Sequence, residues 1–252
     1  MTRRTTSILL GRVALVASLI ALWEILPRSG VVDPDVLPPA SAVVATLSAL
    51  LDRATIRADL LITFAEIAAA YVISLPVGAA LGLLCAESSF WGAVLDPLLF
   101  FVFGIPKSIF LPMFILTAGI GFREKVAFGV FSTFLVVVLN TAAAVRSVRP
   151  DHVLTARACG ARPSQILTRV YLPSMLPILL EGARLALVFT FTAIILAEMY
   201  ASSSGLGYEI ANWGENFDMR PLLAGVVLLA GIAILLNELI RLLERRLSAW
   251  RT

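Results

Sequence analysis

Charged residues are scarce in this sequence. Only 15% of its 252 residues are charged, whereas 59% are hydrophobic. A water-soluble domain of this length has too little interior to bury so much apolar surface. The composition therefore excludes a soluble globular protein and predicts a polytopic membrane protein built as one α-helical domain, residues 1–252.

Cysteine and histidine are also nearly absent. Cys85 lies in an apolar run and Cys159 in a basic segment, so the two cannot form a disulfide framework, and His152 is the only histidine. No cluster is available for zinc, and no close carboxylate pair or nucleophile with a base indicates hydrolysis. We expect neither a catalytic site nor a metal or cofactor on this chain.

Six apolar runs have the length that a helix needs to cross a bilayer, roughly 20 residues. They cover approximately residues 8–26, 61–86, 98–118, 126–145, 176–198 and 222–242. The first follows a basic start, but it has no clear small-residue cleavage site, so we expect a retained helix rather than a signal peptide. Residues 41–52 are predicted to form a short amphipathic helix at the outer interface.

Arginine is distributed unevenly between the two sides. With a cytoplasmic N-terminus, the inner segments hold Arg3, Arg4, the arginines at 146, 149, 157, 162 and 169, and those at 245, 246 and 251. The positive-inside rule then places both termini in the cytoplasm. The basic residues lie beside apolar runs and form no stripe with interleaved aromatics, so we expect lipid rather than nucleic acid as their partner.

The basic segment at residues 149–173 has the pattern of a helix, a break and a second helix. Pro150 and Pro163 can each open a helix, and Pro173 and Pro177 bracket the start of the fifth span. Gly160 removes a side chain where another backbone or helix can approach closely. A polar loop this organised, on the cytoplasmic side of so apolar a protein, is typical of a docking element.

This loop resembles the EAA loop of permease subunits of ATP-binding cassette (ABC) importers, and the similarity extends along most of the chain. In the loop it is carried by Ala156, Arg157, Ala158, Cys159, Gly160, Ala161, Ile166, Val170, Leu172, Pro173 and Pro177. Elsewhere Leu37-Pro38-Pro39, Leu95-Asp96-Pro97, Ile105-Pro106-Lys107, Leu111-Pro112, Asn140-Thr141, Val145-Arg146-Ser147-Val148, Ala197-Glu198 and Ser203 to Tyr208 are similar to the nitrate, sulfonate and taurine branch.

The resemblance implies a binding-protein-dependent type I importer permease in the bacterial cytoplasmic membrane. It implies a second copy of the permease, two ABC ATPase subunits and an extracytoplasmic substrate-binding protein as partners. The chain has no GxxxxGK[ST] motif, which places ATP and Mg on the ATPase. The residues implied in coupling to that ATPase are Ala156, Arg157, Ala158, Gly160, Ala161, Ile166 and Pro173.

Two stretches depart from the family pattern. Leu154 and Thr155 stand where the loop usually has glutamate and alanine, so a contact made by that glutamate is missing. In the second span, Glu66 occupies a position that commonly carries arginine, and Ala70 stands in for a glycine. A reversed charge at residue 66 is expected to alter contacts in the outer part of the bundle.

Three polar residues within or beside the spans are candidates for the translocation pathway: Lys107, Asn140 and Glu198. Lys107 either lines a route for anions or, as a structural residue, reaches the interface and pairs with Asp96. Asn140 either bonds between helices or touches cargo. Glu198 ends the fifth span before the turn SSSGLGY, which is expected to face the binding protein.

The expected function is passage of a small anion, similar to nitrate, sulfonate, taurine or an organic acid, driven by ATP on another chain. The alternative is an autonomous secondary transporter or channel driven by an ion gradient, which would transport without an ATPase. The sequence has no apparent inverted repeat with paired interrupted helices, which is the feature that would favour a secondary transporter. A membrane-embedded enzyme ranks third, because the catalytic constellation is missing.

Overall fold

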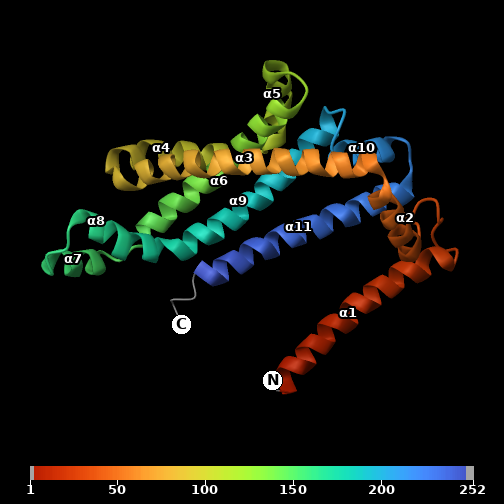
Figure 1. Cartoon of the computed structure of the whole chain (residues 1–252), viewed down its shortest axis with the longest axis horizontal. Coiled ribbons are helices and arrows are strands. Elements are labelled where there is room, and N and C mark those ends of the chain that lie inside the picture. Colours follow the sequence, from red (N-terminus) through yellow and green to blue (C-terminus); the bar gives the residue numbers. More distant parts are fainter. Residues whose placement is uncertain (1–2, 248–252) are drawn as a thin grey trace.

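The computed structural model describes residues 3–247, and the regular elements among them are all helices, as predicted. Figure 1 shows their arrangement. Arg251, one of the arginines assigned to the inner side, lies outside the described residues. The helices are α1 (Arg3–Arg28), α2 (Ala40–Asp52), α3 (Ala54–Glu87), α4 (Ser89–Gly104), α5 (Leu111–Ala118), α6 (Phe122–Arg146), α7 (Pro150–Ala158), α8 (Pro163–Ile166), α9 (Leu172–Tyr200), α10 (Leu206–Glu215) and α11 (Met219–Leu247), with the short helical turns η1 (Lys107–Phe110) and η2 (Leu167–Tyr171).

Five of the described helices are long and apolar enough to cross a membrane: α1, α3, α6, the run from Pro163 through α9, and α11. The third predicted span, at residues 98–118, is instead a pair of helices that meet at an angle of 89°. The break follows from the sequence, because Pro106 has no N–H to donate and holds Ile105 in an extended conformation.

The core of the protein is formed by α3, α6 and α9, which pack along one another. Glycines allow the close approach: a Cβ at Gly78 on α3 would lie 2.5 Å from the Cβ of Val137 on α6. On α9, a Cβ at Gly182 would lie 2.7 Å from the Cβ of Asn140 on α6. Larger side chains at either position would force these helices apart.

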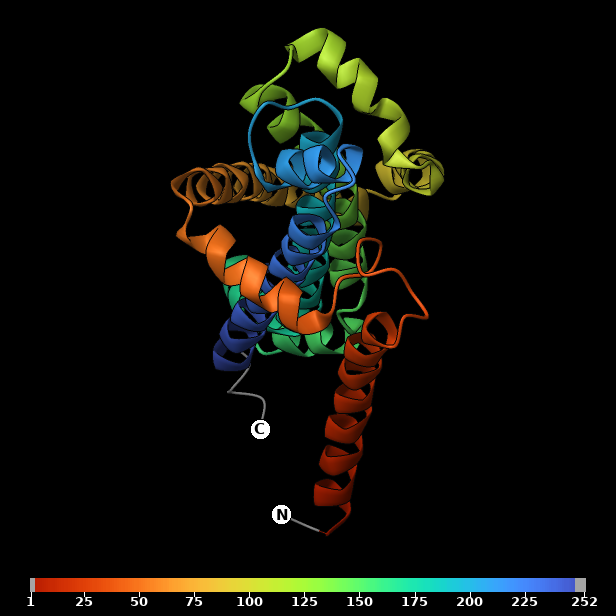
Figure 2. The same ribbon diagram turned by 90° about the vertical axis from the view of Figure 1, so that its right-hand side faces the viewer.

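The two ends of the chain differ in how they pack. Figure 2 shows α1 standing away from the other helices, and none of its most apolar stretch is buried against the rest of the chain. At the other end, α2 and α10 pack against α11 through a cluster that includes Val43, Leu50, Ile210 and Trp213. The amphipathic helix predicted at residues 41–52 thus packs its inner stripe on protein, while Val44 on its outer side is 62% exposed.

Candidate coupling and translocation sites

The basic segment forms the helix, break and helix that its prolines predict. Pro150 and Pro163 open α7 and α8, and the backbone between them turns at Gly160 with φ of +75°. That left-handed conformation is accessible to glycine at little cost. Apart from Gly160 and its two chain neighbours, no atom of the described chain lies within 4 Å of where a Cβ of Gly160 would stand, so the glycine serves the turn and leaves its outer side open.

The predicted coupling residues divide into an outer and an inner group. Arg157, Ala158 and Gly160 are exposed, whereas Ala156, Ala161 and Pro173 are half-buried and Ile166 is buried. Ala156, Ala161 and Ile166 of the inner group belong to a hydrophobic cluster that joins the loop to α6 and α9. This cluster also contains Ala144, Val148, Val153, Val170 and Met175. The loop is therefore fastened to two core helices and presents its other face to solvent.

Two oppositely charged residues form an ion pair in the interior of the bundle. The pair lies near the start of α6 and the end of α9, which are the helix ends farther from the coupling loop. Lys125 Nζ on α6 lies 2.6 Å from Glu66 Oε1 on α3, and the side chains are 2% and 1% exposed. Lys125 also donates to Ser202 Oγ at 3.1 Å. The unusual carboxylate at residue 66 is thus balanced by a lysine, which the sequence analysis did not identify as its partner.

Glu198 is completely buried and both of its oxygens are used. Oε1 accepts from the Thr63 hydroxyl at 2.7 Å, and Oε2 accepts from the backbone N–H of Gly207 at 2.7 Å. Asp59 Oδ1 accepts from the N–H of Gly205 in the same turn. Glu198 therefore fastens the turn between α9 and α10 to α3, and its carboxylate does not line the cavity described next.

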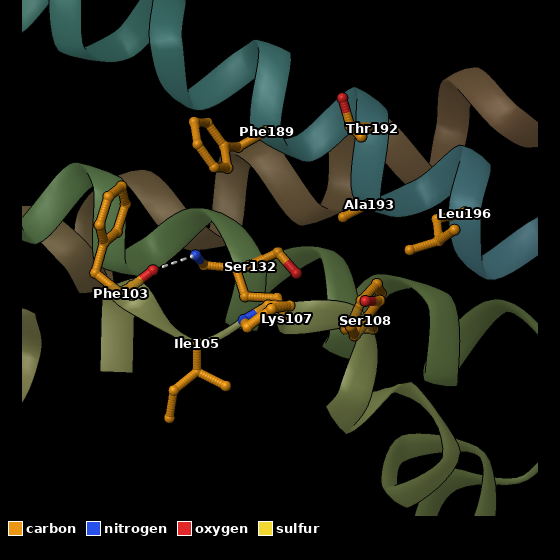
Figure 3. Close-up of a pocket in the computed structure, with 12 residues that line it drawn as sticks. Phe103, Ile105, Lys107, Ser108, Ser132, Phe189, Thr192, Ala193 and Leu196 are labelled. Atoms are coloured by element: carbon orange, nitrogen blue, oxygen red, sulfur yellow. Dashed lines mark hydrogen bonds between the residues drawn. The ribbon is translucent and has the colours of Figure 1, made fainter. Parts of the chain in front are cut away.

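A cavity of about 400 Å³ lies where the bent pair α4 and η1 meets α6 and α9 (Figure 3). Lys107 and Ser108 of η1, Ser132 of α6, and Phe189 and Thr192 of α9 are among its lining residues. Lys107 Nζ donates to the carbonyl of Phe103 at 3.2 Å and lies 4.4 Å from the centre of the Phe103 ring. The cavity thus combines one cation with hydroxyl groups and aromatic rings.

The predicted partner of Lys107 and the predicted role of Asn140 have different outcomes. The pairing of Lys107 with Asp96 was wrong: Asp96 Oδ2 lies 2.6 Å from Arg146 Nη2, because α4 packs beside the end of α6. Asn140 donates to the carbonyl of Val136 within its own helix at 2.8 Å and packs against Gly182. Among the described residues, no hydrogen bond joins Asn140 to another helix.

The chain matches a known family of membrane transport proteins. The sequence pattern of the family described as "Binding-protein-dependent transport system inner membrane component" matches residues 78–249. The chain belongs to this family. It is a multi-pass permease subunit of an ABC importer, and the match includes the loop, the cavity and the core helices α6 and α9.

Curated relatives lie in the branch expected from the sequence. The permease is 30% identical over 235 residues to the putative aliphatic sulfonates transport permease protein SsuC of Bacillus subtilis, covering 93% of this chain and 85% of the relative. It is 30% identical over 243 residues to the taurine transport system permease protein TauC of Escherichia coli, covering 93% and 87%. The family to which the loop and motif resemblance pointed is confirmed.

A solved structure supports the fold. A chain of the MetNI methionine ABC transporter in an inward-facing conformation matches with a TM-score of 0.64 and 20% identity, covering 76% of the permease and 94% of that chain. The type I importer permease fold is therefore confirmed. Sequence reasoning missed Ser132, Phe103 and Phe189, because an isolated serine or phenylalanine in an apolar run gives no local signal of which helix face meets a cavity.

Proposed function

We propose that this permease carries a small anion, of the sulfonate or taurine type, across the bacterial cytoplasmic membrane. The relatives named for sulfonate and taurine transport support this substrate class. The cation of Lys107 in a cavity between core helices is compatible with it. Both termini lie in the cytoplasm in this proposal, and the arginine distribution supports that orientation.

The observation that carries the coupling proposal is the hydrophobic cluster beneath the loop. Val153 and Ile166 pack against Ala144 and Met175, which belong to α6 and α9. The same two helices line the cavity. A push on the loop would therefore be transmitted to the cavity walls by packed side chains, as alternating access by rigid-body movement requires.

The partner that supplies this push is a separate ABC ATPase, two copies of which bind ATP and Mg. Arg157, Ala158 and Gly160 offer the docking face, and the exposed side chain of Leu154 extends it with apolar surface. Apolar contact replaces the charged contact that the family's glutamate would make at residue 154. This chain acts mechanically and hydrolyses no ATP itself.

The remaining partners are a second permease copy and an extracytoplasmic substrate-binding protein. The most apolar stretch of α1 is not buried against the rest of the chain, and this supports packing of α1 against lipid or the second copy. The turn and helix at residues 201–215 lie away from the coupling loop, as Figure 1 shows, and this position supports contact with the binding protein.

Co-purification tests this function. The permease is expressed with its proposed ABC ATPase partner, extracted in mild detergent, and compared with the Arg157→Glu variant. Arg57→Glu is the matched control, because Arg57 is also exposed but lies at the start of α3. We expect wild type and control to retain the ATPase, and Arg157→Glu to weaken its binding about tenfold or more, as loss of a charged interface contact does.

The outcomes separate the two functional classes. Transport by purified permease without any ATPase, together with no association in detergent, would replace the proposal with an autonomous transporter driven by an ion gradient. Equal ATPase retention by all three proteins would leave an importer but remove Arg157 from the docking face.

A further inference from the structure

The cavity between η1, α6 and α9 holds two polar groups whose bonding capacity is not used up. Lys107 Nζ has three N–H donors, and the carbonyl of Phe103 accepts one of them. No carboxylate in the described part of the chain lies within ion-pair distance of Lys107. Its contacts besides that carbonyl are the faces of Phe103 and Phe189, at 4.4 and 5.6 Å from the ring centres.

Ser132 is the second such group. Ser132 is 2% exposed, and its Oγ has no hydrogen-bond partner among residues 3–247. A serine or threonine within a helix ordinarily bonds a carbonyl of the preceding turn, as Thr190 and Thr192 do on α9. A buried hydroxyl without a partner is unfavourable because its lost hydrogen bonds to water are not replaced, so its occurrence at a cavity wall indicates a ligand that completes the bond.

The position of the cavity along the helices is that of a pathway. Ser132 lies ten residues after the start of α6, Phe122, or about 15 Å along the axis at 1.5 Å per residue. That is about half of the hydrocarbon thickness. The cavity volume of about 400 Å³ is within the range of small-ligand sites.

We propose that this cavity is an anion-binding subsite of the permease itself, in which Lys107 and the Ser132 hydroxyl hold the head group of an alkylsulfonate or alkylcarboxylate. Phe103 and Phe189 contact its apolar part. The inference rests on the proposed function and adds to it a place within the membrane where the substrate is recognised.

The chemistry favours an anion over other ligands. A cation would be repelled by Lys107, and a neutral apolar molecule would leave both the ammonium group and the Ser132 hydroxyl without partners. An anionic head group accepts from both, and charge-assisted hydrogen bonds are about twice as strong as neutral ones. The residues that face Lys107 include aromatic rings and hydroxyls, so no resident carboxylate competes with the ligand.

Charge-selective thiol labelling tests the subsite without knowledge of the natural cargo. The permease with its ATPase is placed in nanodiscs, Cys85 is changed to alanine and Cys159 to serine, and Thr192→Cys supplies a reporter on the cavity wall. The probes are 2-sulfonatoethyl methanethiosulfonate, itself an alkylsulfonate, and its trimethylammonium counterpart. Ser29→Cys, at an exposed position in the loop after α1, is the control. Ser132→Cys is a second reporter if Thr192→Cys does not fold.

We expect Lys107→Gln to lower the ratio of anionic to cationic labelling at the cavity reporter about tenfold, while Lys107→Arg preserves it. The ratio at the Ser29→Cys control should not change. Millimolar 1-butanesulfonate should slow labelling at the reporter, and 1-butylamine should not.

An unchanged ratio in Lys107→Gln, or no labelling of either reporter while the Ser29→Cys control reacts, would overturn the subsite. ATPase retention is measured on the same samples. Retention with a failed labelling test rejects the subsite alone, whereas lost retention in the wild type rejects the proposed function as well.

Discussion

Lys125 on α6 and Glu66 on α3 form an ion pair of 2.6 Å inside the bundle, with almost no exposure of either side chain. Glu124, the residue before Lys125, is also completely buried, and its carboxylate has no hydrogen-bond partner in the described chain. Lys125 therefore pairs with one of two buried acids, Glu66. Its removal leaves Glu66 without its ion-pair partner.

Removing one member of the pair is expected to be strongly destabilising. Lys125→Met leaves Glu66 buried and unpaired, which costs about 3–5 kcal/mol. For a chain of this size, the thermal unfolding midpoint should fall by roughly 10 °C or more. Unfolding of the purified protein in detergent, followed by tryptophan fluorescence, measures the shift.

The double variant Lys125→Met with Glu66→Leu is the control, because it removes both charges. We expect it to recover much of the lost stability, since a buried ion pair is often replaceable by apolar residues. Losses that simply add in the double variant would mean that the two charges do not stabilise each other.

Glu198 should stabilise the turn between α9 and α10. Glu198→Ala removes the acceptors for Thr63 and for the N–H of Gly207, and we expect a loss of about 2–3 kcal/mol together with faster proteolysis within residues 201–206. Glu215→Ala, at an exposed site, is the matched control. Equal protease resistance of the two variants would show that the turn is held by other contacts.

Gly160 allows a test of backbone conformation separate from side-chain size. Because φ is +75° and the surrounding space is open, Gly160→Asn should retain ATPase binding, whereas Gly160→Val should reduce it by imposing about 1–2 kcal/mol of strain on the turn. Pull-down of the ATPase with each variant, at matched membrane expression, measures the difference. If asparagine is as damaging as valine, a steric requirement of the ATPase surface is the better explanation.

The pH dependence of stability contains a contribution from Glu209 on α10. Burial raises its pKa above the ordinary value of 4.5, the Asp59 carboxylate adds to the rise, and Arg53 opposes it. The folded state thus favours the protonated form. The stabilising contribution is complete below the unfolded pKa and is lost as pH rises through the folded pKa.

Glu209→Gln should therefore unfold at a higher temperature than the wild type at pH 7.5, and the difference should shrink toward pH 4.5. Thermal unfolding of both proteins across this range provides the test, with Glu215→Gln as the exposed control. A difference that stays constant with pH would remove ionisation of Glu209 as the cause.

The sequence by itself determined the class of protein, the positions of five of the six predicted membrane segments and the form of the coupling loop. An apolar run of about 20 residues is expected to cross the membrane as a helix, because in lipid every backbone N–H and C=O must find its hydrogen-bond partner within the protein. Pro150, Gly160 and Pro163 define the helix, break and helix locally, since each acts through its own backbone geometry. These features depend on neighbours in the chain and are therefore readable from it.

The tertiary structure alone decided which polar groups meet. Glu66 with Lys125, Asp96 with Arg146, and Glu198 with Thr63 each join distant segments, and their pairing depends on the rotation and depth of whole helices. Local periodicity does not specify that rotation when a helix is apolar on all sides. The cavity has the same origin: Pro106 bends the third span, and only packing against α6 and α9 brings Lys107 and Ser132 to the walls of one cavity.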